Sequence, residues 1–326
     1  MTTGMVLGKF LPPHLGHAYL IDFARHYADD LTVVVGTLAA ETIPGVRRYE
    51  WMREMFAGTG TRVVHLDQEL PQDPSEHPEF WRLWENALRP LLPQRLDYVF
   101  ASEQYGWKLA EVLGAQFVQV DIDRSVMPVS GTKVREKPLA HWRYLPPCVR
   151  SHFVRRVSVF GPESTGKSTL AKDLAEHFRT IAVPEYARTL IESQQGRIEA
   201  ADIARIARGQ AASEDALARA ADRVLFCDTD LLLTTIWSDW LFDDCPDEVT
   251  REASRRTYDL TLLTDVDVPW VEDQVRYLPR DRSNFFQRCE TVLQAHRRRY
   301  VVLRGSWEER FRSAVQAVDA LLTSNG

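Results

Sequence analysis

The chain has 326 residues, 44% of them hydrophobic and 26% charged, which indicates about two globular domains, each large enough to bury its own core. Its formal net charge of −6 argues against a general nucleic-acid-binding protein, which is usually basic, although local basic patches are compatible with it. No apolar run approaches the roughly 18 residues of a membrane span, and the 4 cysteines form no C-x-x-C pair, as expected for reduced thiols in a cytoplasmic protein.

The first 135 residues alternate short apolar runs with helical patterns. The apolar runs cover residues 5–7, 31–35, 62–65, 98–101 and 117–120. Helical patterns fill residues 17–28, 47–57, 78–91 and 104–113. Because the runs lack the polar alternation of a half-exposed sheet, they predict parallel strands covered by helices on both faces. This half is therefore predicted to form a three-layer, Rossmann-like α/β domain.

A phosphate-binding loop is predicted directly after the first apolar run. Gly8 permits a tight exit from the strand, and His14 and His17 lie three residues apart where the next helix begins. The N-terminus of that helix favours an anionic phosphate, and Gly16 lets the backbone approach it closely. Imidazoles beside such a turn can donate hydrogen bonds to a phosphoryl transition state. Taken alone, the pattern fits two structural histidines in a proline-rich loop better.

A second polar segment, residues 128–135, follows the last apolar run of this half and opens a helix. Its hydroxyl groups, its backbone amides and the cations of Lys133 and Arg135 could hold the β- and γ-phosphates of a nucleotide. A serine-capped helix start without a ligand is the alternative. Residues 145–148, which include two prolines, interrupt the helical pattern, so we expect the first domain to cover residues 1–150.

The second half repeats the alternation of strands and helices. Its apolar runs cover residues 156–160, 180–183, 223–228, 259–263 and 300–303, and a last helix is expected at 307–322. We therefore predict a second α/β domain with a parallel sheet over residues 151–326. The chain would then consist of two α/β nucleotide-binding domains in tandem.

A P-loop is the most specific motif of the chain. Residues 161–168 fit G-x-x-x-x-G-K-[ST] at every position, between a predicted strand and a predicted helix. Gly161 and Gly166 let backbone N–H groups surround phosphate oxygens. Lys167 would reach the β- and γ-phosphates of ATP, and the Ser168 hydroxyl would contact Mg²⁺. Further ATP contacts are expected from Glu163, Ser164, Thr165 and Thr169.

Acidic residues at two strand ends complete the predicted kinase site. Glu185 lies where small P-loop kinases often place a residue that orients or deprotonates the acceptor hydroxyl; a carboxylate at a helix start is the alternative. Arg188 follows as a candidate substrate contact. Asp228 and Asp230 lie at the end of a buried apolar run and are candidates to hold Mg²⁺ through a water molecule. The alternative is a solvated pair of acids without a metal.

The two polar segments of the first half together resemble the nucleotidylyltransferase superfamily, which has an H-x-G-H loop and a second loop rich in serine and threonine. The Gly-Lys-Phe at 8–10 and the S-G-T-K-x-R at 130–135 are similar to one subgroup, the nicotinamide mononucleotide (NMN) adenylyltransferase domain of NadR-type bifunctional proteins. There a P-loop ribosylnicotinamide kinase domain follows, which is the order found here. Further similar segments are residues 47–51, 102–106 and 121–124.

For the first domain, the resemblance implies that the 5′-phosphate of NMN attacks the α-phosphate of ATP, giving NAD and pyrophosphate. His14 and His17 would stabilise the transferring group, and Lys9, Lys133 and Arg135 would neutralise its charge. Further ATP contacts would come from Gly8, Phe10, Gly16, Ser130, Gly131 and Thr132. The substrate would contact Arg124 and Trp51. Other candidates to stack on nicotinamide, all equally suited to core packing, are Trp81, Trp84 and Trp107.

For the second domain, the resemblance implies transfer of the ATP γ-phosphate to the 5′-hydroxyl of nicotinamide riboside. Residues 269–276 match the family segment P-W-V-x-D-x-x-R at every fixed position, although Gln274 replaces a common glycine and leaves the turn geometry open. Trp270 would stack on the pyridinium ring, and Asp273 would bind the ribose. Arg276 would contact the substrate. The arginines expected to close as a lid over ATP, unless they form a solvated basic loop, are Arg276, Arg280 and Arg282.

Alternatives remain open at this point. The same folds could serve other nucleosides, because the motifs define phosphate handling better than base recognition. The first domain could mainly sense NMN or NAD. Some NadR-type proteins carry an N-terminal helix-turn-helix and repress transcription; here the first strand starts within seven residues of Met1, so we expect no nucleic-acid binding. The expected ligands are nicotinamide riboside, NMN, NAD and ATP. The family also suggests a link to a riboside transporter, without membrane insertion, and leaves homo-oligomers open.

Overall fold

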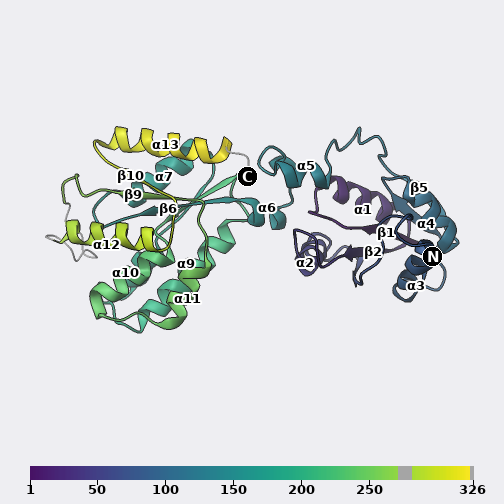
Figure 1. Ribbon diagram of the computed structural model, residues 1–326, viewed down its shortest axis with the longest axis horizontal. Helices are drawn as coiled ribbons and strands as arrows, with labels where there is room; N and C mark the ends of the chain where they lie inside the picture. Colours follow the sequence, from purple (N-terminus) through teal and green to yellow (C-terminus); the bar gives the residue numbers. More distant parts are fainter. Residues whose placement is uncertain (271–280, 324–326) are drawn as a thin grey trace. The chain divides into compact units, whose positions relative to one another are not determined.

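The computed structural model describes residues 1–270 and 281–323, which fold into two compact units, Met1–Val149 and Arg150–Gly326 (Figure 1). Each unit contains a five-stranded sheet in which every strand pair between named strands is parallel. The predicted fold class, α/β with parallel sheets, is confirmed. Within the described residues, no helix combines the length and hydrophobicity of a membrane span.

The first unit has the strand order β3-β2-β1-β4-β5. Its strands are β1 (Thr3–Gly8), β2 (Asp30–Thr37), β3 (Arg62–Asp67), β4 (Tyr98–Ala101) and β5 (Gln116–Gln119). Its helices are α1 (Leu15–Tyr27), α2 (Gly45–Met55), α3 (Phe80–Leu88), α4 (Tyr105–Leu113) and α5 (Gly131–Glu136). The chain order reverses between β1 and β4, and ligands of open parallel sheets bind at such a point, beyond the carboxyl ends of the strands.

Strand β2 shows why the apolar runs lack polar alternation. Val33 and Val35 pack in one core cluster with Ile21 of α1 and Met52 of α2, whereas Val34 packs in the opposite cluster with Leu109 of α4. Alternate residues of a strand point to opposite faces, and here both faces are covered. The sheet is therefore buried on both sides, and only its carboxyl edge is available to a ligand.

The second unit has the strand order β10-β9-β6-β8-β7. Its strands are β6 (Arg155–Phe160), β7 (Ile181–Val183), β8 (Val224–Asp228), β9 (Leu260–Thr264) and β10 (Tyr300–Leu303). Its main helices are α7 (Lys167–His177), α8 (Tyr186–Ser193), α9 (Asp202–Leu217), α10 (Leu231–Phe242), α11 (Asp247–Arg255), α12 (Arg282–Ala295) and α13 (Trp307–Thr323). Helices α7 and α13 cover one face of the sheet, and α10 and α12 cover the other (Figure 1).

The junction of the two units differs from the sequence-based expectation in one detail. A short helix, α6 (Pro147–Phe153), forms where the proline pair was expected only to interrupt helical structure. Proline suits the first position of a helix, because the backbone N–H that it lacks would have no intrahelical partner there.

Candidate active sites

A cavity of about 680 Å³ lies at the carboxyl ends of the strands of the first unit, a volume that can hold a nucleotide. Arg124 lines it, and a smaller adjoining cavity adds His14 and Gly16. Residues of both predicted phosphate-binding segments line the larger cavity: Gly8, Lys9, Phe10, His17, Ser130, Gly131, Thr132 and Arg135. The fold therefore brings the two segments together around one cavity.

The two histidines form an interlocked cap at the start of α1. The His14 backbone N–H donates to Nδ1 of His17 at 3.3 Å, and the His17 backbone N–H donates to Nδ1 of His14 at 3.3 Å. The rings stack with their centroids 3.6 Å apart. Since each Nδ1 accepts a hydrogen bond, the proton of each neutral ring is on Nε2.

Burial keeps both imidazoles neutral. It lowers the pKa of His14 to about 4, with help from the nearby Arg124 cation. Burial, together with the neighbouring His14 ring and the Arg124 cation, holds the pKa of His17 well below its usual range. At neutral pH the pair therefore presents two N–H donors, suited to phosphate oxygens, without adding charge.

The loop after β1 is held by a buried arginine that sequence reasoning missed. Arg48 is fully buried and donates to the backbone carbonyl of Lys9 and to the carboxylate of Glu41. The Nζ atom of Lys9 lies 3.2 Å from the other carboxylate oxygen of Glu41. This pairing fixes the loop that leads from Lys9 to the histidines. The similarity of residues 47–51 to the family was the available signal. From this segment, sequence reasoning chose Trp51 as the functional residue and overlooked Arg48.

Trp51 does not line the cavity, which corrects the expectation that it contacts the substrate. It is only 4% exposed and lies on the inward face of α2 with Arg48 and Met52. The tryptophans that do line the cavity are Trp81 and Trp84, and Nε1 of Trp84 donates to the carbonyl of Pro71 at 2.9 Å. Trp81 and Trp84, which were named as alternative stacking candidates, therefore lie where a substrate in this cavity could contact them.

The second polar segment docks on the first. Ser130 caps α5 by accepting from the backbone N–H of Lys133 at 3.3 Å. Arg135 donates to the carbonyl of Leu11 and, at 3.1 Å, to the hydroxyl of Thr132. A methyl group on Gly131 would stand 2.6 Å from the same Leu11 oxygen, so only glycine allows this approach. The side chain of Lys133, by contrast, is exposed and does not line the cavity.

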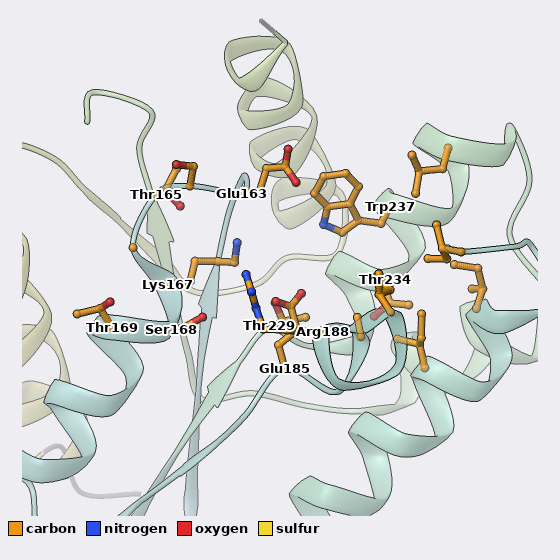
Figure 2. Close-up of a pocket in the computed structure, with 18 residues that line it drawn as sticks. Glu163, Thr165, Lys167, Ser168, Thr169, Glu185, Arg188, Thr229, Thr234 and Trp237 are labelled. Carbon is orange, nitrogen blue, oxygen red and sulfur yellow. The ribbon is translucent and has the colours of Figure 1, made fainter. Parts of the chain in front are cut away.

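In the second unit, a cavity of about 160 Å³ lies beside the P-loop, with a polar and an apolar end (Figure 2). The polar end combines residues 163–169 with Glu185, Arg188 and Thr229. The apolar end consists of Ile191, Ile198, Ile203, Ile206, Trp237 and Leu241. The polar end therefore suits phosphate groups in its chemistry, and the apolar end suits an aromatic base.

The P-loop has the conformation that its glycines permit. Gly161 and Gly166 have φ values of 135° and 83°, in the region where a side chain would be strained. A methyl group on Gly161 would also stand 2.7 Å from the Thr264 hydroxyl. The ammonium group of Lys167 donates to the Pro162 carbonyl at 2.9 Å, which holds the lysine side chain over the loop.

Glu185 and Asp228 lie close to the lysine cation. Burial raises the pKa of Glu185, and the charge of Lys167 opposes that shift. Burial raises the pKa of Asp228 as well, against the charge of Lys167 and a hydrogen bond from the Ser168 side chain. Within the described residues, Oδ1 of Asp228 is buried without a hydrogen-bond partner. The two predicted acids therefore accompany the P-loop, as the motifs indicated.

Asp230 has a different role from the one predicted for it. It is fully buried, and its Oδ1 accepts from the backbone N–H of Leu233 at 3.0 Å, so it caps α10. Neither Asp230 nor Asp228 lines the cavity, and Oδ2 of Asp230 is buried without a hydrogen-bond partner among the described residues. Thr229, with φ at 79°, turns the chain between the two acids. Asp230 therefore caps α10 through one oxygen, and Asp228, which lies near Lys167 and Ser168, is the stronger candidate for a metal ligand.

A buried polar chain holds the segment that carries Glu185. The side-chain oxygen of Gln210 in α9 accepts from the Tyr186 backbone N–H at 3.0 Å, and its amide donates to Glu214 at 3.4 Å. The Tyr258 hydroxyl donates to Glu214 at 2.8 Å, and burial raises the pKa of Glu214 to about 7. These residues are distant in sequence, so no local motif could reveal the connection.

The predicted lid segment is described only at its two ends. Asp273, Arg276 and Arg280 lie outside the described residues. The guanidinium group of Arg282 donates to the carbonyls of Ser164 at 3.4 Å and Val268 at 3.0 Å, and lies 5.5 Å from the ring centroid of Trp270.

Trp237, rather than Trp270, lines the cavity, and it packs on Phe285 with ring centroids 4.3 Å apart. Sequence reasoning missed Trp237, because α10 is apolar on several sides and has no motif that marks one face.

Comparisons with known proteins agree over nearly the whole chain. An AAA domain family matches residues 156–310. The trifunctional NAD biosynthesis/regulator protein NadR of Escherichia coli is 30% identical over 346 residues, covering 98% of this chain and 83% of that protein. Its Salmonella typhimurium counterpart is also 30% identical, covering 99% and 84%. A nicotinamide-nucleotide adenylyltransferase of Aeropyrum pernix is 30% identical over 139 residues, covering 40% of this chain and 76% of that protein.

Solved structures show the same fold. A crystal structure of a NadR protein in complex with NR aligns with a TM-score of 0.82 at 24% identity, covering 99% of this chain and 97% of that one. A NadR protein in complex with NAD and AMP-PNP aligns with a TM-score of 0.79 at 24% identity, covering 100% and 97%.

Proposed function

The chain belongs to the NadR family, and we propose that its two domains convert nicotinamide riboside to NAD in two ATP-dependent steps. The observation that carries this proposal is that each domain gathers a phosphate-binding motif at a cavity on the carboxyl edge of its sheet. The second domain would act first, as ribosylnicotinamide kinase, and the first domain would then act as NMN adenylyltransferase. Both reactions consume ATP, which the cytoplasm supplies.

In the kinase step, the apolar end of the second cavity would hold the nicotinamide ring against Trp237, with the ribose directed toward Glu185. The 5′-hydroxyl oxygen would attack the γ-phosphorus of ATP, its proton would pass to Glu185, and ADP would leave. Burial raises the pKa of Glu185, which makes it a better proton acceptor than an exposed carboxylate. Lys167 would neutralise charge on the β- and γ-phosphates.

Ser168 and Asp228 would hold Mg²⁺ at this site. They fit the ion because both offer oxygen ligands, and Oδ1 of Asp228 is a buried acceptor without a partner among the described residues. When bound with ATP, Mg²⁺ offsets the negative charge of the phosphates.

In the adenylyl-transfer step, the 5′-phosphate of NMN would attack the α-phosphorus of ATP, and pyrophosphate would leave. The nucleophile is already an anion, so no protein base is required. The two neutral histidines would donate to the oxygens of the transferring group, and Lys9 and Arg135 would offset its charge. Arg124 would contact the substrate from the cavity wall.

A product assay tests both steps. The purified chain is incubated with Mg·ATP and either nicotinamide riboside or NMN, and the products are separated by liquid chromatography. From the riboside we expect ADP and NMN, with NMN converted further to NAD and pyrophosphate, and from NMN we expect NAD and pyrophosphate. NMN without NAD would reduce the first domain to a sensor, and turnover of other nucleosides in preference to the riboside would refute the substrate assignment.

A further inference from the structure

Trp307, the first residue of α13, is an exposed tryptophan that the proposed reaction leaves unused. Its side chain is 57% exposed, and it lies against the P-loop rather than in solvent alone. A methyl group on Gly166 would stand 2.3 Å from Cζ3 and 2.8 Å from Cη2 of the indole. The six-membered ring of Trp307 therefore contacts the backbone of the P-loop at its second glycine.

A buried cation holds this indole in place. The Arg310 guanidinium lies 5.4 Å from the centroid of the Trp307 ring, and Arg310 is only 2% exposed. It donates to the carbonyl of Thr165 in the P-loop at 3.0 Å and to the carbonyl of Asp265 at 2.9 Å. The hydrogen bonds of Arg310 thus connect the P-loop to the residue that follows β9, and the same guanidinium group supports the indole.

The loop before the indole is also fixed. The backbone N–H of Gly305 donates to Asp267 at 2.6 Å. The Ser306 backbone N–H donates to the Glu309 carboxylate at 2.8 Å, and the Glu309 backbone N–H returns a hydrogen bond to the Ser306 hydroxyl at 3.3 Å. This reciprocal cap defines the start of α13. An aromatic surface held this firmly loses little conformational entropy when a ring stacks on it.

The position of Trp307 points to the donor nucleotide. For in-line transfer, the γ-phosphate of ATP must face the acceptor cavity, which residues 163–169 line. The base of ATP must then leave the P-loop away from that cavity. Trp307 touches Gly166 but does not line the acceptor cavity, so it stands beside the phosphate loop on a surface that the riboside does not use.

We propose that the indole of Trp307 is the stacking surface for the purine base of ATP in the second domain. The inference rests on the proposed kinase function of that domain. Stacking between an aromatic side chain and a base is tolerant of base identity, because every base has a π-face. The site would therefore select for a purine nucleotide by area of contact, and it would discriminate weakly between adenine and guanine.

The test is the ATP dependence of riboside phosphorylation in the full chain. Because base stacking contributes about 1–3 kcal/mol, Trp307→Ala should raise KM for ATP about 5- to 150-fold while kcat stays nearly unchanged. Trp307→Phe should restore most of the affinity. Trp107→Ala is the matched control, because Trp107 is also exposed but belongs to the other domain, and it should have no effect on this reaction.

Inorganic tripolyphosphate separates stacking from a structural role of the ring, because it has the phosphates of ATP without the base. Its inhibition constant in the kinase reaction should be the same for the wild type and Trp307→Ala. An unchanged KM for ATP in Trp307→Ala would overturn the proposal. A parallel loss of tripolyphosphate affinity would also overturn it, since the ring would then only support the P-loop.

Equilibrium dialysis with labelled ATP keeps the inference separate from the proposed function. If the wild type phosphorylates no riboside, the kinase assignment fails. ATP binding to the P-loop can still be measured, because it is the part of the total ATP binding that Lys167→Ala removes. Trp307→Ala should weaken binding at that same site. Full affinity there would refute the stacking role whatever the acceptor is.

Discussion

Asp228 at the end of β8 and Asp230 two residues later allow a sharp test, because the same substitution should impair the kinase reaction at the first position and not at the second. Asp228→Asn removes a buried carboxylate whose pKa is raised by burial, and it also removes the oxygen charge proposed to hold Mg²⁺. A raised pKa means that the folded state disfavours the ionised form. At neutral pH the neutral amide should therefore leave the protein as stable as the wild type or more stable.

The loss of charge should appear in metal dependence instead. With an effective dielectric constant of about 20, a unit charge that directly accompanies a divalent ion contributes several kcal/mol, so the Mg²⁺ requirement of the kinase should rise at least ~100-fold. Asp230→Asn keeps a good helix cap, because asparagine and aspartate cap almost equally well, and it should preserve both activity and stability. Asp230→Ala should instead cost about 1 kcal/mol, or roughly 2–4 °C in melting temperature, without changing metal dependence.

The assay is riboside phosphorylation over a Mg²⁺ titration, with thermal unfolding measured on the same samples. The adenylyl-transfer rate of each variant serves as the internal control for intact protein. Normal Mg²⁺ dependence in Asp228→Asn would refute the metal assignment. An equal loss in Asp230→Asn would show that the cap and the metal site act together, contrary to the geometry described above.

Three further predictions concern the separation of the sites and the state of the histidines. Lys167→Ala should abolish riboside phosphorylation and leave NAD formation from NMN intact, whereas His17→Ala should do the reverse. Each variant should lose about 100-fold or more of the affected activity. Loss of both activities in a folded variant would contradict two independent sites. Because burial lowers the pKa of His14 to about 4 and holds that of His17 well below its usual range, the rate of adenylyl transfer should show no histidine step between pH 6 and 8. A histidine step near pH 6.5 in the pH–rate profile would exclude neutral donors. Gly131→Ala places a methyl group 2.6 Å from the Leu11 oxygen, so it should lower adenylyl transfer sharply in a steady-state assay and spare the kinase; normal NAD formation would show that the two loops do not need this contact.

The sequence predicted those parts of the site that depend on local chemistry. The P-loop and the second polar segment of the first domain combine glycines, hydroxyls and cations at fixed spacing, and the first polar segment combines glycines, a lysine and two histidines; each was found at a cavity. Side chains placed by tertiary packing were not predictable in this way. The direction of Trp51 depends on which face of α2 meets the sheet, and Trp237 lies on a helix whose apolar residues surround it on several sides.

The role of Asp230 shows a second kind of limit. An acid directly before an apolar helix is a capping signal, and an acid at a strand end is a metal-site signal, and this position satisfies both. What decides between them is the turn at Thr229, whose positive φ directs Asp230 toward its own helix. Thr229 belongs to no motif, so the sequence indicated a metal ligand or a solvated acid pair, and the cap was not predicted.

The interlocked histidines also affect which metals the first domain can tolerate. A pair of imidazoles beside a nucleotide would ordinarily attract zinc or copper, which bind the unprotonated ring nitrogen. Here that nitrogen is Nδ1 on both rings, and each is already occupied by a backbone N–H. Coordination through Nε2 would require both rings to change tautomer and to give up the cap of α1, at a cost of about 1 kcal/mol for each hydrogen bond. The same hydrogen bonds that orient the donors toward phosphate therefore weaken the binding of transition metals through Nε2 by about 2 kcal/mol, or roughly 30-fold.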